Sequence, residues 1–247
     1  MMRFEGRVAL ITGAGSGMGR AITRRLCDEG ASVLAVEIDK ARLDETLGLV
    51  EGTVAGHPAD VGDPDACSAA VEACLERFGR LDVLGNVAGI YRAAHTTAMS
   101  RDDYRRVMSV NLDGPFFLSQ AAIPHLLESA GNIVNIASNS GIQGVPYSAA
   151  YAASKGGIIQ LTRSLAVEYL KTRLRVNAIA PAGTNTNIAT NVSFPDDMDP
   201  DLAARMAGLR GLTEPEEVAA LFAFLASDEA RSVTGAVYTI DNGITVS

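Results

Sequence analysis

The sequence predicts a doubly wound α/β fold: a parallel seven-stranded sheet with helices on both faces, in a single domain. Short β-branched or apolar runs alternate with longer stretches of helical periodicity along the 247 residues, and this alternation is typical of successive βαβ units. Several of the short runs are almost continuously apolar, as strands buried on both faces are. No internal repeat, charge block or low-complexity linker interrupts the pattern, so we assign residues 1–247 to one domain.

Turn and capping residues separate the elements in the first half of the chain. We predict strands at 8–12, 32–37, 53–57 and 82–86. We predict helices at 17–29, 40–50 and 64–78. Asp39 precedes the second helix, and Asp63 precedes Pro64 at the start of the third, so both aspartates are interpreted as helix caps. Asp60, just after the third strand, is therefore freer for another task.

The second half of the chain continues the alternation but contains one irregular segment. We predict strands at 132–137, 175–180 and 236–240. We predict helices at 100–128, 148–170 and 214–227. Pro115 has no N–H for the carbonyl of Asn111, so we expect a kink in the first of these helices. Residues 182–211 contain Pro195, Pro200 and an acidic run, and they follow the carboxyl end of a strand, where such sheets bind ligands. We expect a substrate lid there, with a solvated surface loop as the alternative for its acidic middle.

Composition and charge argue against several classes of partner. The net charge is −8, only 5% of residues are aromatic and Trp is absent, so we expect neither a nucleic acid nor an anionic membrane surface. Cys27, Cys67 and Cys74 have neither the number nor the spacing of a disulfide framework or a metal site, so we expect no metal. No apolar run reaches the roughly 18 residues of a membrane span, and residues 1–7 lack the apolar core of a signal peptide. We therefore expect a cytoplasmic protein.

A glycine-rich turn, TGAGSGMG at residues 12–19, connects the first strand to the first helix. Its glycines at 13, 17 and 19 allow a sharp turn and a close approach of the backbone to a pyrophosphate, which the N–H groups of the helix N-terminus would bind. The spacing differs from G-x-G-x-x-G, because Met18 stands five residues after Gly13. The position of the turn favours nucleotide binding, and a plain tight connection is the alternative.

The second predicted strand ends at an acidic residue that favours NAD over NADP. Glu37 lies 20 residues past Gly17, near the spacing expected of a carboxylate that binds the adenosine ribose and repels a 2′-phosphate. The glycine turn contains no Lys or Arg before Gly19 that would attract this phosphate. Asp39 is a rival for the ribose, but it is also the predicted helix cap.

Tyr151 and Lys155 are the residues best suited to proton transfer. Their spacing of four places both side chains on one face of the predicted helix. The chain has 18 arginines but only three lysines, so a cation needed only for solvation would here usually be arginine. A phenol has a pKa of about 10, and exchange of a proton near neutral pH requires this pKa to fall by roughly three units. A nearby ammonium and a positively charged nicotinamide can both lower it.

The ordered set of motifs resembles the short-chain dehydrogenase/reductase family, a Rossmann-fold family, over essentially the whole chain. The matches are Thr12-Gly13, Gly17 and Gly19 in the glycine turn, Asp60 for the adenine ring, Asn86-Val87-Ala88-Gly89, Asn111, Ser138, Tyr151, Lys155, Thr234-Gly235 and Asp241-Asn242-Gly243. Ser138 precedes Tyr151 by 13 residues, which is similar to the family's spacing. Ser140 and Ser148 lack this spacing, and Tyr147 lacks a Lys four residues later.

The resemblance implies a role for each matched residue. Tyr151 is the implied acid/base, Lys155 lowers its pKa and holds the nicotinamide ribose, and Ser138 hydrogen-bonds the substrate oxygen. Asn111 would hold a water that links Lys155 to solvent; the alternative is a polar residue that accommodates the kink at Pro115. The implied dinucleotide contacts are Gly13, Ser16, Gly17, Met18, Gly19, Glu37, Asp60, Val61, Asn86, Ala88, Gly89, Tyr151, Lys155, Pro181, Thr184 and Thr186.

The chain departs from the family pattern at two positions. Val87 replaces the second Asn of Asn-Asn-Ala-Gly, which should be tolerated if the first Asn carries the structural hydrogen bonds. Ala182 replaces the Gly that usually follows the proline, here Pro181. Thr186 matches the threonine that binds the nicotinamide carboxamide, and Thr184 is the alternative contact.

The predicted substrate pocket is mostly apolar. Its foremost candidates are Ile90, Gln143, Tyr147 and Ile188, joined by Ile142, Val145 and Phe194. Residues 184–198 contain no Lys or Arg, which disfavours a negatively charged acyl-carrier substrate and favours a neutral cyclic or aliphatic alcohol.

These observations predict an oxidoreductase that transfers a hydride between NAD and a small-molecule secondary alcohol or ketone. One alternative is an NAD-binding family member with a non-redox reaction, such as a dehydration or epimerisation. Another is a non-catalytic nucleotide-sensing or scaffold protein, although such proteins usually lack the Tyr or the Lys. The resemblance further implies a homotetramer, or a homodimer, that buries faces of the helices at 100–128 and 148–170.

Overall fold

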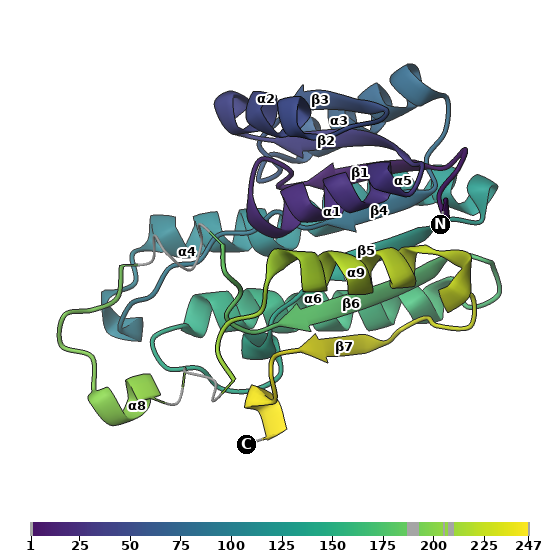
Figure 1. Ribbon diagram of the computed structural model, residues 1–247. Helices are drawn as coiled ribbons and strands as arrows, with labels where there is room; N and C mark the ends of the chain where they lie inside the picture. The colour runs from purple at the N-terminus through teal and green to yellow at the C-terminus, as the bar shows by residue number, and fades with distance from the viewer. Residues whose placement is uncertain (1, 187–192, 205, 207–209, 247) are drawn as a thin grey trace.

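The chain folds around one parallel sheet. A computed structural model describes residues 2–186, 193–204, 206 and 210–246. In this part of the chain seven strands pair in the order β3-β2-β1-β4-β5-β6-β7, all in parallel, which confirms the predicted sheet (Figure 1). The strands are β1 Val8–Thr12, β2 Ser32–Glu37, β3 Val54–Pro58, β4 Val83–Asn86, β5 Asn132–Ile136, β6 Arg175–Pro181 and β7 Val237–Ile240.

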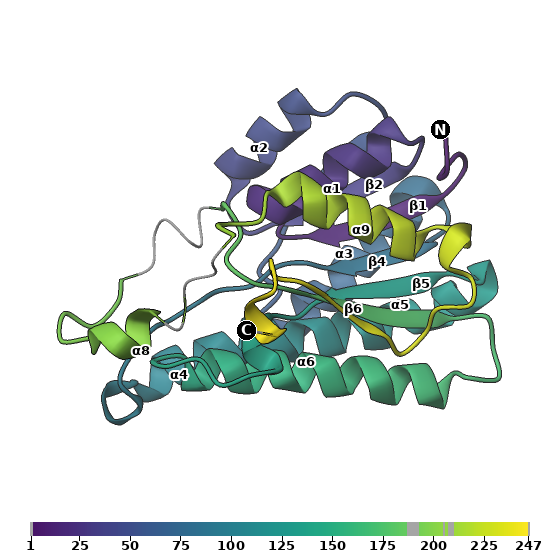
Figure 2. The ribbon, with the colours of Figure 1, turned by 60° about the horizontal axis from the view of Figure 1, so that its bottom comes forward.

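Helices cover both faces of the sheet. The helices α1, α2 and α9 pack on one face, where Ile22, Leu43 and Phe222 belong to one buried cluster. The helices α3, α5 and α6 pack on the other face, around Val71, Leu118 and neighbouring side chains, and Figure 2 shows the two layers. Their bounds are α1 Gly17–Asp28, α2 Lys40–Leu49, α3 Pro64–Phe78, α4 Arg101–Met108, α5 Gly114–Ser129, α6 Ala149–Glu168, α8 Pro200–Ala204 and α9 Pro215–Ala226.

The strand order places a ligand-binding crevice at the middle of the sheet. Chain connections run from β1 outward to β2 and β3, and then return to β4 on the other side of β1. The loops after β1 and β4 therefore diverge, and open sheets of this type bind ligands at such a point. Figure 1 shows the carboxyl ends of β6 and β7 pointing to the side where α4 and α8 lie.

Both predicted helix caps are present. The Asp39 carboxylate accepts hydrogen bonds from the N–H groups of Ala41 and Arg42 at 2.9 and 3.2 Å. The Asp63 carboxylate accepts one from the N–H of Asp65 at 3.0 Å, and Pro64 begins α3. Side-chain oxygens thus satisfy N–H groups that have no partner within the first helical turn.

The predicted helix at 100–128 is not continuous. Residues Ser109–Asp113 form a π-helical turn between α4 and α5, in which the N–H of Gly114 donates to the carbonyl of Ser109. Pro115 has no N–H to continue the ordinary pattern, so the distortion lies where the proline predicts it. The prediction of a single helix is therefore wrong here. The wider turn also changes the direction in which Asn111 points. The sequence also did not predict the short helix α8 inside the irregular segment.

Three further features concern the cysteines, possible metal ligands and possible membrane-spanning helices. Cys27, Cys67 and Cys74 are buried and unpaired, and burial raises the pKa of each thiol to about 12. Within the described residues we find no group of three or more His, Cys, Asp or Glu side chains that could hold a metal ion. No helix in the same part of the chain is long and apolar enough to cross a membrane.

Candidate active site

The glycine turn between β1 and α1 packs tightly against the loop that follows β4. Gly13 and Gly17 have φ angles of +66° and +48°, which L side chains rarely adopt. A Cβ on Gly19 would lie 2.0 Å from the carbonyl oxygen of Gly13, and a Cβ on Gly13 would lie 2.8 Å from Cα of Ala88. Only glycine allows these approaches, so the turn keeps a backbone surface open to a ligand.

A threonine at the end of β1 joins these two loops. The Thr12 hydroxyl accepts hydrogen bonds from the N–H groups of Val87 and Ala88 at 3.0 and 3.1 Å and donates to the carbonyl of Gly85 at 3.3 Å. Ser16 precedes α1 but makes no side-chain capping bond. The Ser16 side chain therefore does not occupy the first N–H groups of α1. An anion site at a helix N-terminus requires that such N–H groups stay available.

A cavity of about 450 Å³ runs along this crevice, and we call it the glycine-turn cavity. Glu37 lines it, and its carboxylate accepts hydrogen bonds from the N–H groups of Gly15, Ile38 and Asp39, each at 3.1 Å. A Cβ on Gly15 would lie 2.6 Å from Cγ of Glu37. The carboxylate thus lies against the glycine turn. The predicted contacts that line this cavity are Gly13, Ser16, Gly17, Met18, Gly19, Glu37, Asp60, Val61, Ala88, Gly89 and Thr186.

Asp60 is less free than the sequence predicts. Its carboxylate pairs with both terminal nitrogens of Arg106 at 2.8 and 3.1 Å and accepts the N–H of Gly62 at 2.9 Å. Burial opposes ionisation, but the hydrogen bonds from Arg106 and Gly62 outweigh it and hold the pKa of Asp60 below its ordinary value. Arg106 is 46 residues away in the chain, so sequence spacing gave no sign of this ion pair. Arg106 and Arg42 also line the cavity, and neither was predicted there.

The Asn86 side chain lies in the interior of the sheet, and Asn86 is not among the described residues that line the glycine-turn cavity, so its contact with the dinucleotide stays a prediction. Its side chain is 2% exposed and donates hydrogen bonds to Asn135 Oδ1 at 2.8 Å and Ser119 Oγ at 3.4 Å. It therefore ties β4 to β5 and α5, while Ala88 and Gly89, further along the chain, face the cavity. Alternation along a strand explains the difference, because the loop turns toward the crevice only after β4 ends.

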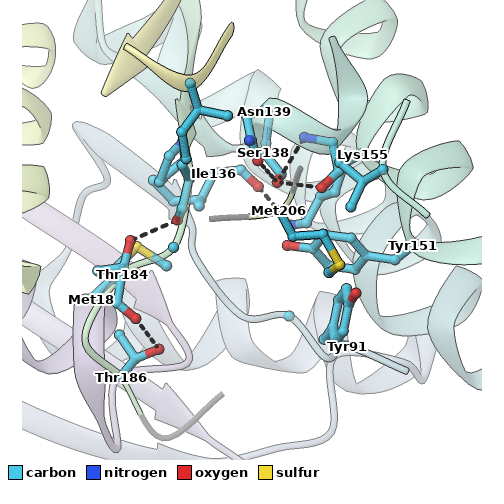
Figure 3. A pocket seen from close by; sticks show the side chains of 18 of the residues that line it. Met18, Tyr91, Ile136, Ser138, Asn139, Tyr151, Lys155, Thr184, Thr186 and Met206 are labelled. Carbon is cyan, nitrogen blue, oxygen red and sulfur yellow. Dashed lines mark hydrogen bonds between the residues drawn. The ribbon is translucent and has the colours of Figure 1, made fainter. Parts of the chain in front are cut away.

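Ser138, Tyr151 and Lys155 meet at the carboxyl end of β5 (Figure 3). Ser138 follows β5, whereas Tyr151 and Lys155 lie one turn apart on α6. Tyr151 hydrogen-bonds Ser138, and the Lys155 ammonium donates to the carbonyl of Ile136 at 2.8 Å. A Cβ on Gly141 would lie 2.7 Å from the backbone of Lys155, so the loop carrying Ser138 packs directly on α6. The structure brings together three of the four predicted catalytic side chains in one cluster.

Burial controls the proton affinities of this cluster. Burial raises the pKa of Tyr151 to about 12, although its hydrogen bond with Ser138 opposes the rise. Burial also lowers the pKa of Lys155 to about 8. The ammonium lies 5.8 Å from the centre of the Tyr151 ring. Desolvation is thus the largest influence on both groups in the chain alone, and the lowering of the Tyr151 pKa by Lys155 stays a prediction.

The Asn111 side chain holds the loop after β4. It is fully buried, accepts the N–H of Ile90 at 2.8 Å, and donates to the carbonyl of Ile90 at 2.9 Å and to Ser154 Oγ at 3.2 Å. A Cβ on Gly89 would lie 3.4 Å from both Asn111 Oδ1 and Lys155 Nζ. Asn111 and Lys155 thus approach each other across Gly89, and the amide group of Asn111 fixes the backbone between the two cavities.

A second cavity of about 240 Å³ opens beside Tyr151, and we call it the tyrosine cavity. Met18 and Thr186 line both cavities, and a Cβ on Gly17 would lie 2.8 Å from Cγ2 of Thr186. Thr184 also lines the tyrosine cavity, but it is 5% exposed and its backbone forms a bridge with Thr213. Thr186 is thus the one of the two threonines that lies at the junction of the cavities.

The predicted substrate residues have different locations. Gln143 lines the tyrosine cavity, as do Val145, Phe194, Pro181 and Ala182. Ile90 lines the glycine-turn cavity instead, because Asn111 holds its backbone there. Ile188 lies outside the described residues.

Tyr147 also lies elsewhere than predicted. It is not one of the described residues that line the tyrosine cavity. Its backbone has a φ of +59°, its ring contacts His95 at 5.1 Å, and its hydroxyl accepts the N–H of Asp199 at 2.9 Å. The left-handed backbone turns the side chain toward the segment around α8, which the sequence could not show.

Several residues of the tyrosine cavity were not predicted, among them Tyr91, Met206 and Ile244. Tyr91 stands two residues after Gly89 of the Asn-x-Ala-Gly motif, and this position was the one available signal. Met206 and Ile244 reach the cavity from segments distant in sequence.

Comparisons with known proteins agree with this geometry. The family described as "Enoyl-(Acyl carrier protein) reductase" matches residues 13–245. The chain is 40% identical to meso-2,3-butanediol dehydrogenase of Serratia marcescens, covering 100% of this chain and 97% of the relative. It is also 40% identical to 3-oxoacyl-[acyl-carrier-protein] reductase of Thermotoga maritima, covering 99% and 100%. The crystal structure of 3-ketoacyl-(acyl-carrier-protein) reductase from Brucella melitensis complexed with NADH has a TM-score of 0.90 and 31% identity, covering 98% and 100%.

Proposed function

The chain belongs to the short-chain dehydrogenase/reductase family of oxidoreductases, and on this premise we propose that it interconverts a secondary alcohol and a ketone with NAD. The observation that carries the proposal is the position of Tyr151, Ser138 and Lys155 in a cavity that shares five wall residues with the glycine-turn cavity: Met18, Val87, Gly89, Tyr91 and Thr186. A dinucleotide along one cavity would place its reactive end in the other.

The residues present fit a nicotinamide dinucleotide. The pyrophosphate would lie on the glycine turn, the adenosine ribose at Glu37, and the adenine near Asp60 and Val61. The nicotinamide end would lie beside Pro181 and Thr186, with Thr184 behind, and its ribose near Tyr151 and Lys155. When bound, this group supplies a hydride to the carbonyl carbon of a ketone, or accepts one from an alcohol.

The chain's own residues would move the proton. In ketone reduction the Tyr151 phenol donates its proton to the carbonyl oxygen, which becomes the alcohol oxygen, and Ser138 hydrogen-bonds the same atom. In alcohol oxidation the proton returns to Tyr151. The high pKa of Tyr151 keeps the phenol protonated near neutral pH, which suits reduction. Asn111 would act as a positioning residue for the loop between the cavities, and its main-chain carbonyl, which Pro115 cannot satisfy, would hold the predicted water.

A comparison of NADH with NADPH tests the cofactor assignment. We expect NADH to raise the thermal midpoint more than NADPH at equal concentration, because a ligand that binds only the folded state raises the midpoint. A midpoint that neither dinucleotide raises would contradict the proposal and favour a non-catalytic protein. A shift without turnover of any alcohol or ketone would favour a non-redox reaction.

Glu37→Gln should weaken the preference for NADH. Glutamine keeps the size of the side chain and removes the charge that would repel a 2′-phosphate. Like charges a few ångströms apart repel by on the order of 1 kcal/mol or more, so the ratio of the two dissociation constants should fall by about fivefold or more. Asp44→Asn, which removes a carboxylate that pairs with Lys40 on α2, is the matched control. An unchanged ratio in Glu37→Gln would move the ribose contact elsewhere.

The uncharged character of the tyrosine cavity indicates the substrate class. Among the described residues that line it, Lys155 is the only basic residue, and there is no Asp or Glu. The other ionisable side chains in the wall are the phenols of Tyr91 and Tyr151. The cavity therefore suits a neutral small molecule, such as the diol named for the Serratia relative, better than an anionic acyl carrier.

Segment 182–211 contributes to this cavity, which supports its proposed role as a substrate lid. Phe194 and Met206 line the cavity. Around α8, the Asp199 N–H bonds the Tyr147 hydroxyl at 2.9 Å, and Asp197 pairs with His95 at 2.9 Å. These contacts tie the part of the segment around Asp197 and Asp199 to Tyr147 and His95, and a lid would depend on them.

Tyr147→Phe should loosen the lid. The change removes one hydrogen bond, which contributes about 1 kcal/mol, so we expect KM for a ketone to rise by about fivefold while the dissociation constant for NADH stays constant. Tyr104→Phe, at an exposed tyrosine of α4, is the control. If KM in Tyr147→Phe equals that of Tyr104→Phe, the hydroxyl does not support the lid.

We also propose that the chain forms a homotetramer or homodimer through α5 and the end of α6. Phe116 and Leu127 of α5 are 44% and 38% exposed, Val167 near the end of α6 is 71% exposed, and Leu170 just after α6 is 65% exposed. Exposed apolar side chains gathered on two helices are typical of an interface. Sedimentation of the protein gives its mass, and a monomer at micromolar concentration would contradict this proposal.

A further inference from the structure

Tyr91 occupies a position that the assigned roles leave unexplained. It lies in the loop after β4, and it lines both the tyrosine cavity and the glycine-turn cavity. Figure 3 shows its ring next to Tyr151, on the side of Tyr151 away from Lys155. A residue in this position contacts whatever lies between the phenol of Tyr151 and the mouth of the cavity.

The hydroxyl of Tyr91 is committed to the protein. It lies 2.5 Å from Ser148 Oγ, and Ser148 Oγ lies 3.0 Å from the carbonyl oxygen of Pro146. A carbonyl can only accept, so the single proton of the Ser148 hydroxyl is donated to Pro146. Tyr91 must then donate its own proton to Ser148. Ser148 is fully buried, so this bond fixes the far end of the Tyr91 side chain.

The ring of Tyr91 is fixed by two aromatic neighbours. Its centre lies 4.7 Å from that of Tyr151 with the planes at 77°, an edge-to-face contact, and 6.2 Å from that of Phe194. Edge-to-face pairs at such distances stabilise one relative orientation of the rings. Burial also raises the pKa of Tyr91, so its phenol stays neutral. The ring is thus an uncharged wall of fixed position beside the ring of Tyr151.

We propose that Tyr91 is the specificity-determining residue of this site: its ring packs against the hydrocarbon group next to the carbonyl of an uncharged ketone, and its edge orients Tyr151. Ser148 acts through Tyr91 as a positioning residue. The inference rests on the proposed function, and it adds the surface by which the site would select a hydrocarbon group. Neither Phe194 nor Met206, which belong to the lid segment, is anchored by a comparable hydrogen bond to a buried side chain in the described structure.

A series of methyl ketones tests the wall directly. The probes are 2-butanone, 2-pentanone and 2-hexanone, each reduced with NADH by wild-type protein and by the variants. If each added CH₂ is buried against the ring, kcat/KM should rise by about fourfold per CH₂ while the cavity has room. In Tyr91→Ala the rise should fall below about twofold per CH₂, because the added groups then face a solvated space.

Three further variants separate the wall from the orientation of Tyr151. Tyr91→Phe keeps the ring but loses the bond to Ser148, so the dependence on chain length should persist while kcat falls by a few-fold. Ser148→Ala should reproduce this result, and the double variant should lose no more than either single one, because all three remove the same bond. Tyr104→Ala, at an exposed site on α4, should match wild type in every measurement.

The outcomes distinguish this inference from the proposed function. If wild type binds NADH but reduces none of the ketones, the proposed substrate class fails, and the inference fails with it. If wild type reduces them and Tyr91→Ala keeps the same dependence on chain length, only the role of Tyr91 is overturned. A Tyr91→Ala protein without a cooperative thermal transition is misfolded. Tyr91→Leu, which keeps an apolar side chain but not the ring, then decides: an unchanged dependence on chain length overturns the role.

Discussion

Tyr151→Phe is expected to lower the turnover of a ketone by about three orders of magnitude, since proton transfer by a positioned side chain contributes roughly 10²- to 10⁴-fold. Phenylalanine keeps the ring and its contact with Tyr91 but has no proton to give. Binding of NADH should stay close to wild type, because the glycine turn and Glu37 are untouched. The measurement pairs steady-state reduction with titration of NADH, and Tyr104→Phe is the control for loss of a phenol elsewhere.

The direction of the pH dependence gives this experiment a second readout. In alcohol oxidation Tyr151 must accept a proton, so the phenolate is the active form and the rate should rise with pH toward the high pKa of this residue. In ketone reduction the protonated phenol is active, and Tyr151 itself should cause no fall in rate near neutral pH. The residual oxidation by Tyr151→Phe should lack the rise. A variant that keeps wild-type turnover in both directions would remove Tyr151 from the mechanism.

Gly19→Ala is expected to abolish binding of the dinucleotide and to destabilise the fold. The added Cβ would lie 2.0 Å from the carbonyl oxygen of Gly13, and the clash involves backbone on both sides, so the start of α1 must move away from the turn. Overpacking of this kind costs about 1–3 kcal/mol. We expect a lower thermal midpoint that NADH no longer raises.

Gly48→Ala is the matched control for this substitution. Gly48 lies in α2, and nothing lies within 4 Å of a Cβ placed on it. Alanine favours a helix over glycine by about 1 kcal/mol, so this variant should be slightly more stable than wild type and keep its response to NADH. If Gly19→Ala behaves like Gly48→Ala, the close approach at the turn has no role in binding.

The sequence predicted the sheet, the turn and the Tyr–Ser–Lys cluster because each depends on local signals. Hydrophobic periodicity predicts strands and helices, and Pro115 marked the distortion that the structure shows as a π-helical turn. The family resemblance grouped Ser138 with Tyr151 and Lys155, and the structure brings these three side chains together at the carboxyl end of β5. The roles of these residues stay predictions until the substitutions are tested.

What the sequence missed depends on contacts between distant segments. Asp60 pairs with Arg106 across 46 residues, and the direction of the Asn86 side chain depends on where β4 ends. The Tyr147 side chain points away from the tyrosine cavity because its backbone is left-handed. A tyrosine in the sequence gives no sign of such a backbone conformation. The rise in the pKa of Tyr151 follows from burial by the surrounding fold, which no spacing of Tyr and Lys encodes.

The two cavities share Met18 and Thr186 as walls, and this sharing has a thermodynamic consequence. A molecule that moves either side chain on entering one cavity changes the free energy of binding in the other. Linkage makes the effect reciprocal: the factor by which the dinucleotide alters the affinity for substrate equals the factor by which the substrate alters the affinity for the dinucleotide. Substitutions at Met18 or Thr186 should therefore change this coupling factor as well as the separate affinities.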